Sequence, residues 1–196
     1  MENKEIKTDQ RIIVGATGAS GSPLLIECLR QIRDTAGYEA ELILTPAAEL
    51  TLRQESDVTL EEVKGLAVRT YAIDSIGAPP ASGSYPTAGM VIVPCSMHTL
   101  AGIHSGFSDN LLLRAADVTI KEGRRLVLAV RESPLSAIHL RNMQELALLS
   151  NVKIMPPMMT FYNRPDSIDE MVKAFAARLL LPFGIKHQEH REWTGI

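Results

Sequence analysis

A glycine-rich turn near the start of the chain has residues suited to holding an anion. Gly15, Gly18 and Gly21 stand three residues apart after a short run at 11–14, and a helix with one apolar side is expected directly after them. Glycine lets the backbone turn sharply and approach a ligand closely, and the first amides of a helix attract negative charge. This order of strand, turn and helix is typical of α/β proteins that bind a phosphate. The alternative is a tight turn that binds no ligand.

The spacing of these glycines differs from the usual dinucleotide fingerprint. That fingerprint is G-x-G-x-x-G, with an acidic residue about 20 positions later that binds a ribose hydroxyl. Here the pattern is G-x-x-G-x-x-G, and the second expected strand, at 39–44, is followed by Thr45 rather than by an acid. A hydroxyl at this place suits a phosphate or a flavin ring better than a ribose diol.

Strands and helices are expected to alternate along the whole chain. Strands are predicted at 11–14, 39–44, 90–93, 125–130 and 152–155, and the main helices after Gly21, from Pro46 to near 55, and at 109–122, 136–149 and 167–181. This alternation predicts an α/β fold, a doubly wound, flavodoxin- or Rossmann-like parallel sheet with helices on both faces. Residues 1–10 are expected to form an N-terminal tail, 11–184 one flavin-binding domain and 185–196 a C-terminal tail.

In such a sheet, ligands bind at the carboxyl ends of the strands. The residues expected at those ends are rich in hydroxyl groups, glycine and charge: 15–20, Thr45, 96–99, Arg131, Glu132 and Tyr162. Ser96 and Thr99 suit a phosphate or flavin edge, but they also suit an N-cap of the next helix. Arg131 and Glu132 form either a charged pair at the mouth of the sheet or a solvated ion pair.

Other polar features are placed by local patterns. Residues 59–62 and 167–170 read as capping boxes that open helices. Arg114, Asp117 and Lys121 form one polar stripe on the helix at 109–122. The glycine-, proline- and serine-rich stretch at 77–89 is long enough to suggest a functional loop. Taken alone, Arg114, Lys121 and Arg178 read as solvent-facing charges, and His98 as a structural or exposed histidine.

Composition excludes several classes of protein. The 196 residues carry a net charge of −3, which argues against general attraction to nucleic acid. No apolar run approaches the roughly 18 residues of a membrane span, and no signal-peptide core is present. Cys28 and Cys95 are the only cysteines, and reduced thiols predict a cytoplasmic protein. No HExxH, CxxC or clustered His/Cys set is present, so no metal site is expected.

Four stretches, in order, resemble the flavin prenyltransferases of the UbiX type. They read VGATGASGS, APPASGSYPTAGMVIVPCSMHTLAGI, RAADVTIKEGRRLVLAVRESPLS and MPPMMTFYNRP. The resemblance runs from about Arg11 to Trp193, nearly the whole chain. The C-terminal EHREWTGI resembles the subgroup encoded beside hydroxyarylic acid decarboxylases, known as B subunits.

The resemblance implies a metal-independent prenyltransferase. Members of the family use FMN in its reduced form and transfer a dimethylallyl group from dimethylallyl phosphate to N5 and C6 of the flavin. The product, prenylated FMN, serves a UbiD-type decarboxylase. The resemblance also implies a homo-oligomer, typically a dodecamer, with no nucleic-acid or membrane partner.

The family pattern also assigns residues. The resemblance implies an FMN site made by Gly18, Ala19, Ser20, Thr45, Ser96, Met97, His98, Thr99 and Arg131. It places Ser82, Gly83, Arg114, Lys121, Tyr162 and Arg178 around the prenyl phosphate, and Trp193 beside the prenyl group. Ser20, near N5, together with Glu55 and Glu132, is implied in catalysis. Thr45 stands where the family usually has serine, and Pro46 where lysine is common.

Two other functions remain open from the residues. The related cysteine decarboxylases share the expected fold, but they usually carry a histidine on the first helix and a P-A-S-A-N-T type loop. This chain has no histidine on that helix, and the loop reads PCSMHT. A flavodoxin-like FMN electron carrier is the other alternative, and it would not explain the set of Arg, Lys and Tyr residues.

Overall fold

The computed structural model describes residues 10–186 of the chain. Within that range, six parallel strands form one sheet in the order β3-β2-β1-β4-β5-β6. The strands are β1 (Arg11–Ala16), β2 (Glu39–Leu44), β3 (Arg69–Tyr71), β4 (Gly89–Cys95), β5 (Arg125–Val130) and β6 (Val152–Ile154). This is the usual order of a Rossmann-type sheet, with its switch point between β1 and β4. The predicted doubly wound α/β fold is confirmed.

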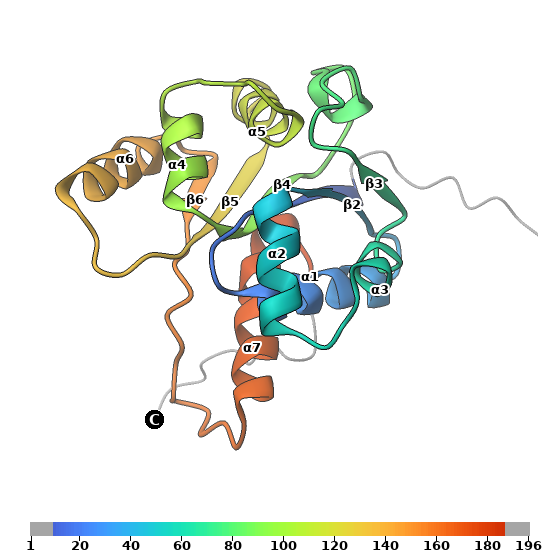
Figure 1. The fold of residues 1–196 in the computed structure, drawn as a ribbon, viewed down its shortest axis with the longest axis vertical. Coiled ribbons are helices and arrows are strands. Elements are labelled where there is room, and N and C mark those ends of the chain that lie inside the picture. The colour runs from blue at the N-terminus through green and yellow to red at the C-terminus, as the bar shows by residue number, and fades with distance from the viewer. Residues whose placement is uncertain (1–9, 187–196) are drawn as a thin grey trace, which may run out of the picture.

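Helices cover both faces of the sheet (Figure 1). One face carries α1 (Ser22–Asp34), α2 (Pro46–Glu55), α3 (Leu60–Lys64) and α7 (Ile168–Leu180), and the other carries α4 (Met97–His104), α5 (Leu111–Lys121) and α6 (Ala137–Ala147). Short 3-10 turns lie at Pro79–Ala81 (η2) and Leu181–Phe183 (η3). Among residues 10–186, no helix has the length and apolar character that crossing a membrane would require.

The core is divided by the sheet into two apolar layers. Side chains alternate along β1, so that Ile12 and Val14 pack toward α1 and α7, while Ile13 packs toward α5. Every residue of β4 is buried, as expected for a central strand covered on both faces. The two layers together fix the carboxyl ends of β1 and β4 side by side.

Some details differ from the sequence-based prediction, which included no separate helix at Met97–His104 (α4). β3 was not predicted, because it is three residues long and its first two residues, Arg69 and Thr70, are exposed at an edge of the sheet. The capping box at 59–62 is confirmed. The one at 167–170 is only half formed: Ser167 caps the Glu170 amide, but the Glu170 carboxylate accepts a hydrogen bond from the Asp166 amide instead.

Candidate functional site

Thr17 joins the ends of the two central strands. Its hydroxyl donates to the Pro94 carbonyl over 2.9 Å and accepts from the Ser96 amide over 2.8 Å. Its own amide donates to the same carbonyl over 3.2 Å. The side chain is almost fully buried, so these bonds are shielded from water. Thr17 therefore holds the glycine-rich turn against the loop at 96–99. The sequence analysis did not single it out, although its place between Gly15 and Gly18 was a signal.

Further backbone bonds extend this edge to both sides. The Thr45 amide donates to the Ala16 carbonyl over 3.1 Å, and the Arg131 amide donates to the Cys95 carbonyl over 3.0 Å. The carboxyl ends of β2, β1, β4 and β5 are thus joined in a continuous edge. The predicted gathering of the glycine-rich turn, Thr45, the loop at 96–99 and Arg131 at one edge of the sheet is confirmed. Their contacts with a flavin remain a prediction.

Two hydroxyl groups at this edge cap helices. Thr45 Oγ1 accepts from the Ala48 amide over 3.1 Å at the start of α2, and Ser96 Oγ accepts from the Thr99 amide over 3.3 Å at the start of α4. The N-capping interpretation is therefore confirmed for Ser96 but not for Thr99, which lies in the first turn of α4 and supplies the capped amide. A capping hydroxyl retains a proton to donate; Ser96 directs its own to Thr99 Oγ1, over 3.2 Å. The Thr45 hydroxyl therefore has the chemistry to cap a helix and bind a ligand at once.

A carboxylate of the protein occupies the start of α1. Glu55, the last residue of α2, accepts hydrogen bonds through Oε2 from the Gly21 amide at 3.0 Å and the Ser22 amide at 2.8 Å. The sequence analysis expected these amides to bind a ligand anion. That expectation was wrong for these two amides, because Glu55 already supplies the negative charge that the helix N-terminus favours.

Ser20 belongs to the same cluster, since its side chain also hydrogen-bonds to Glu55. Burial acts to raise the pKa of the Glu55 carboxyl, but hydrogen bonds from Ser20, Gly21 and Ser22 outweigh it and lower the pKa below its usual value. Glu55 is therefore anionic at neutral pH. A hydroxyl that donates to a carboxylate keeps its lone pairs free to accept another proton donor. The Ser20 hydroxyl and the Glu55 carboxylate are therefore neighbours at the start of α1.

Charged side chains at the end of β5 point to solvent in a single protomer. Arg131 and Glu132 are both exposed, and Glu132 Oε1 accepts a hydrogen bond from the Ser133 amide over 3.0 Å. Glu132 is exposed because no element within residues 10–186 of the same protomer covers the segment after β5. His98 is exposed on the first turn of α4, in agreement with the sequence-based interpretation.

A second group of predicted site residues lies where α5 meets the loop at 77–89. Arg114 Nε donates to the Ala81 carbonyl over 3.2 Å, and its guanidinium pairs with Asp117 at 2.5 Å. Lys121 pairs with the neighbouring Glu122 and lies against the backbone of Gly83. Ser82 is exposed. In Figure 1 this loop is the green segment near the top, beside α5.

This second group lies at the amino ends of the strands, whereas the glycine-rich turn lies at their carboxyl ends. Lys121 ends α5 only a few residues before β5 begins, and the Ala88 amide donates to the carbonyl of Arg11, the first residue of β1. The position of Lys121 just before β5 and the hydrogen bond from Ala88 to Arg11 both place the loop at the amino ends of the strands. Within one protomer, therefore, the residues predicted to bind the flavin and those at Gly83 and Lys121 are not brought together.

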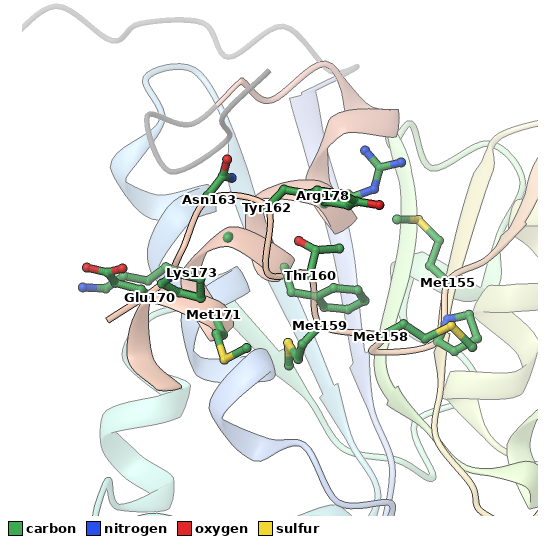
Figure 2. Close-up of a pocket in the computed structure, with 14 residues that line it drawn as sticks. Met155, Met158, Met159, Thr160, Tyr162, Asn163, Glu170, Met171, Lys173 and Arg178 are labelled. Atoms are coloured by element: carbon green, nitrogen blue, oxygen red, sulfur yellow. The ribbon is translucent and has the colours of Figure 1, made fainter. Parts of the chain in front are cut away.

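Tyr162 and Arg178 line a third region, a groove of about 890 Å³ between the segment after β6 and α7 (Figure 2). Four methionines line it as well: Met155, Met158, Met159 and Met171. Tyr162 is 79% exposed, although it lines the groove. In Figure 1 the segment before α7 runs down beside that helix, away from the sheet. The predicted contact from Trp193 lies outside the described residues.

Metal and thiol chemistry have no support in the described part of the chain. No cluster of three or more His, Cys, Asp or Glu side chains suited to a metal ion occurs in residues 10–186. Cys28 and Cys95 are buried and unpaired with each other. Burial raises the pKa of the Cys95 thiol to about 12, which keeps it protonated and a poor nucleophile.

Comparisons with known proteins agree with these features. The sequence model of a protein family described as Flavoprotein matches residues 1–179. A probable UbiX-like flavin prenyltransferase from Streptomyces sp. (strain D7) is 46% identical over 186 residues, which cover 95% of this chain and 92% of the relative.

Two solved structures are also similar. The crystal structure of AnUbiX (PadA1) in complex with FMN and dimethylallyl pyrophosphate has a TM-score of 0.92 and 42% identity, covering 96% of this chain and 99% of that one. A dodecameric FMN-dependent UbiX-like decarboxylase from Escherichia coli O157:H7 also has a TM-score of 0.92, with 43% identity, covering 94% of this chain and 100% of that one.

Proposed function

The chain belongs to the Flavoprotein family and, within it, to the UbiX-like flavin prenyltransferases, and we propose that it joins a dimethylallyl group from dimethylallyl phosphate to N5 and C6 of reduced FMN. The observation that carries the proposal is the Ser20–Glu55 pair at the carboxyl edge of the sheet. The proposal is also supported by a similar structure, AnUbiX (PadA1), which was crystallised with FMN and dimethylallyl pyrophosphate. The reaction needs proton transfer at the flavin and a stabilised phosphate leaving group, and the chain has residues for both.

The residues at the carboxyl edge fit FMN. Thr45 offers a hydroxyl proton, Arg131 an exposed cation, and the start of α4 the amides of Met97 and His98, which a helix leaves without internal partners. We assign the phosphate and polar ring edge of FMN to these groups, with Gly18, Ala19, Ser96 and Thr99 completing the site. Reduced FMN, when bound, supplies the nucleophilic N5 and C6 atoms. No metal is needed in this proposal, because the charges come from the protein.

Ser20 and Glu55 handle the proton in this proposal. As the Ser20 hydroxyl proton passes to the Glu55 carboxylate, the Ser20 oxygen would take up the proton that leaves N5 of the flavin, so that Ser20 ends as a hydroxyl and Glu55 as a carboxylic acid. Because the pKa of Glu55 is lowered, it holds a proton only transiently, as suits a relay rather than a proton store. Glu132 is the second carboxylate of the proposed site, and its exposure in one protomer leaves it open to a ligand or a neighbouring protomer.

The cations of the second and third groups are assigned to the departing phosphate. Breaking the carbon–oxygen bond of an allyl phosphate builds negative charge on the phosphate, which positioned Arg and Lys side chains stabilise. Arg114 and Lys121 are paired with Asp117 and Glu122 in the protomer. A bound phosphate competes with those carboxylates. Ser82 and Gly83 in the adjoining loop, and Tyr162, Arg178 and Trp193 late in the chain, complete the proposed substrate site.

We propose that the complete site is shared between protomers. The flavin turn and Lys121 lie at opposite edges of one sheet, so a single protomer does not bring them to one ligand. The exposed Tyr162 and the methionine-lined groove would then face another copy of the chain. A dodecameric relative is consistent with a closed homo-oligomer of this kind.

The product would leave the site and be used elsewhere. We propose that prenylated FMN passes to a UbiD-type decarboxylase in the cytoplasm. This placement rests on the two buried thiols, which form no disulfide with each other in the structure.

Decarboxylation by the chain itself is the competing function, since one similar structure is described as an FMN-dependent UbiX-like decarboxylase. The deciding experiment has two arms without oxygen. The reduced protein–FMN complex receives dimethylallyl phosphate or dimethylallyl pyrophosphate, and the oxidised complex, whose flavin can accept two electrons, receives a peptide with a C-terminal cysteine. Prenyl transfer releases inorganic phosphate from the first or pyrophosphate from the second. Release of carbon dioxide from the peptide, with no phosphate or pyrophosphate from the other two, would replace the proposal by a decarboxylase.

A further inference from the structure

Arg124, directly before β5, forms two hydrogen bonds to the loop at 77–89. Its Nη1 donates to the Tyr85 carbonyl over 2.7 Å and its Nη2 donates to the Gly83 carbonyl over 2.6 Å. The side chain is partly buried. A planar guanidinium with fixed N–H directions suits two acceptors at once, which a lysine ammonium does not reproduce. Both acceptors are backbone atoms, so Arg124 fixes the path of the loop whatever the side chains there.

The same loop is fixed a second time through the side chain of Tyr85. Its hydroxyl donates to Glu41 Oε1 over 2.6 Å, and the Tyr71 hydroxyl donates to Glu41 Oε2 over 3.0 Å. Glu41 is only 2% exposed. Arg11 neutralises it, with Nε 3.2 Å from Oε1, and also lies 4.9 Å from the centre of the Tyr85 ring. A buried carboxylate with a cation and two hydroxyl donors is stable only if all stay in place.

The hydrogen bonds of Arg124 and Tyr85 determine where the loop lies relative to Lys121, the cation assigned to the phosphate. A Cβ added to Gly83 would overlap the Glu122 carboxylate and lie 2.8 Å from Lys121 Nζ. The backbone at 82–83 therefore lies directly on the Lys121–Glu122 pair. A small displacement of the loop would change the space available beside Lys121.

We propose that Arg124 and Tyr85 are positioning residues that hold Ser82 and Gly83 beside Lys121, so that loop and cation together form the prenyl-phosphate site. Neither side chain touches the phosphate itself: Arg124 acts through two backbone carbonyls, and Tyr85 acts through Glu41. The inference rests on the proposed function for the identity of the ligand, but the anchoring of the loop does not depend on it.

The test uses the full-length chain and two readouts. Hydrogen–deuterium exchange of residues 77–89 reports the anchoring directly, and steady-state kinetics report its effect on the substrate. The variants are Arg124→Gln, Arg124→Lys, Tyr85→Phe and the double variant Arg124→Gln/Tyr85→Phe. Arg125→Gln is the matched control, because it removes the same charge from an exposed neighbouring residue.

Exchange in 77–89 is expected to speed up in Arg124→Gln and Tyr85→Phe but not in Arg125→Gln. The KM for dimethylallyl phosphate should rise about tenfold in Arg124→Gln, short of the roughly hundredfold loss that a 1 Å misplacement can cause. FMN affinity should stay unchanged in these variants. Arg124→Lys should show the same defect as Arg124→Gln. In the double variant, the rise in KM should be smaller than the product of the rises in the two single variants.

Three results would overturn the inference. Unchanged exchange in Arg124→Gln would remove the anchoring. A raised KM in Arg124→Gln with normal exchange and a silent Tyr85→Phe would make Arg124 a direct phosphate contact. If hydrogen–deuterium exchange of the loop speeds up as much in Arg125→Gln as in Arg124→Gln, the effect of Arg124 comes from its charge and not from its two hydrogen bonds. If the wild-type protein fails to prenylate FMN, the proposed function falls, while the exchange experiment still decides the anchoring.

Discussion

Glu55 Oε2, at the end of α2, lies 2.8 Å from the backbone nitrogen of Ser22, at the start of α1. This contact places a charge that is negative at neutral pH at the positive end of a helix dipole, beside the Ser20 hydroxyl. In the proposed function, a ligand phosphate therefore uses other amides at the carboxyl ends of the strands, those at the start of α4. Glu55 thus caps α1 in the structure, and the proposed function gives the same carboxylate a second task, that of accepting a proton.

Replacing this carboxylate should make stability less dependent on pH. The folded-state pKa of Glu55 is lowered, so its contribution is fully present above the ordinary Glu pKa of about 4.3 and is lost as the pH falls through the lower folded value. Glu55→Gln should lower the free energy of unfolding at pH 7 by about 1 kcal/mol, as for the loss of an N-cap. Urea denaturation between pH 7 and pH 3 measures the difference.

The control for this prediction is Glu39→Gln at the start of β2. The difference in the free energy of unfolding between wild type and Glu55→Gln should become smaller toward acid pH. The corresponding difference between wild type and Glu39→Gln should not become smaller in the same way. A gap that is constant from pH 7 to pH 3 would mean that the charge of Glu55 does not stabilise the fold.

Ser20→Ala should separate binding from catalysis. One hydroxyl among many contacts is lost from the flavin site, so FMN affinity should fall by no more than about 1 kcal/mol. Formation of the flavin adduct should slow by roughly 10²-fold or more, as for loss of a general acid–base group. Stopped-flow mixing of the reduced complex with dimethylallyl phosphate measures the rate. Wild-type turnover with FMN bound would remove Ser20 from the relay.

Thr17→Val should loosen the switch point between β1 and β4. The change keeps the shape of the side chain but leaves the partly buried Ser96 amide without its acceptor, which costs about 1–3 kcal/mol. FMN affinity should fall with stability, because the turn and the loop at 96–99 separate. Thr17→Ser is the control, since it keeps the hydroxyl. Chemical denaturation and FMN titration of both variants give the comparison, and equal behaviour of Val and Ser would contradict the role.

Much of this arrangement could be predicted from the sequence, for physical reasons. Apolar runs such as 90–93 and 125–130 define central strands, and hydroxyls such as Ser96 define helix starts. Contacts between segments far apart could not be predicted. The bond from Glu55 to the start of α1 spans more than 30 residues, and the grip of Arg124 on Gly83 spans 41. No local pattern encodes either pairing.

The exposure of Glu132 could not be predicted, for a related reason. A charged residue after an apolar strand tells where the strand ends, but not which surface covers the next segment. In one protomer that segment is open to solvent. Residues of one functional site that lie on different copies of a chain leave no trace in the spacing of a single sequence.

Mixing two inactive variants would test the shared site. Glu132→Gln alters the carboxyl edge, and Lys121→Met alters the amino edge of the sheet. Each alone should lose roughly 10²–10⁴-fold in rate, as general acid–base groups and charge-stabilising groups do. If the two residues serve a site from different protomers, co-refolded mixtures contain some sites in which both residues are intact. Activity should then reappear on mixing. Mixtures no more active than their components would place the whole site in one protomer.

The most direct test of the proposed activity is the mass of the flavin released after one anaerobic incubation. Full-length protein is loaded with FMN, reduced, mixed with dimethylallyl phosphate and then denatured, with a parallel sample that lacks the prenyl phosphate. The account predicts a flavin heavier by one prenyl unit in the first sample only, formed in the presence of EDTA. Unmodified FMN in both samples, with the donor intact, would contradict it.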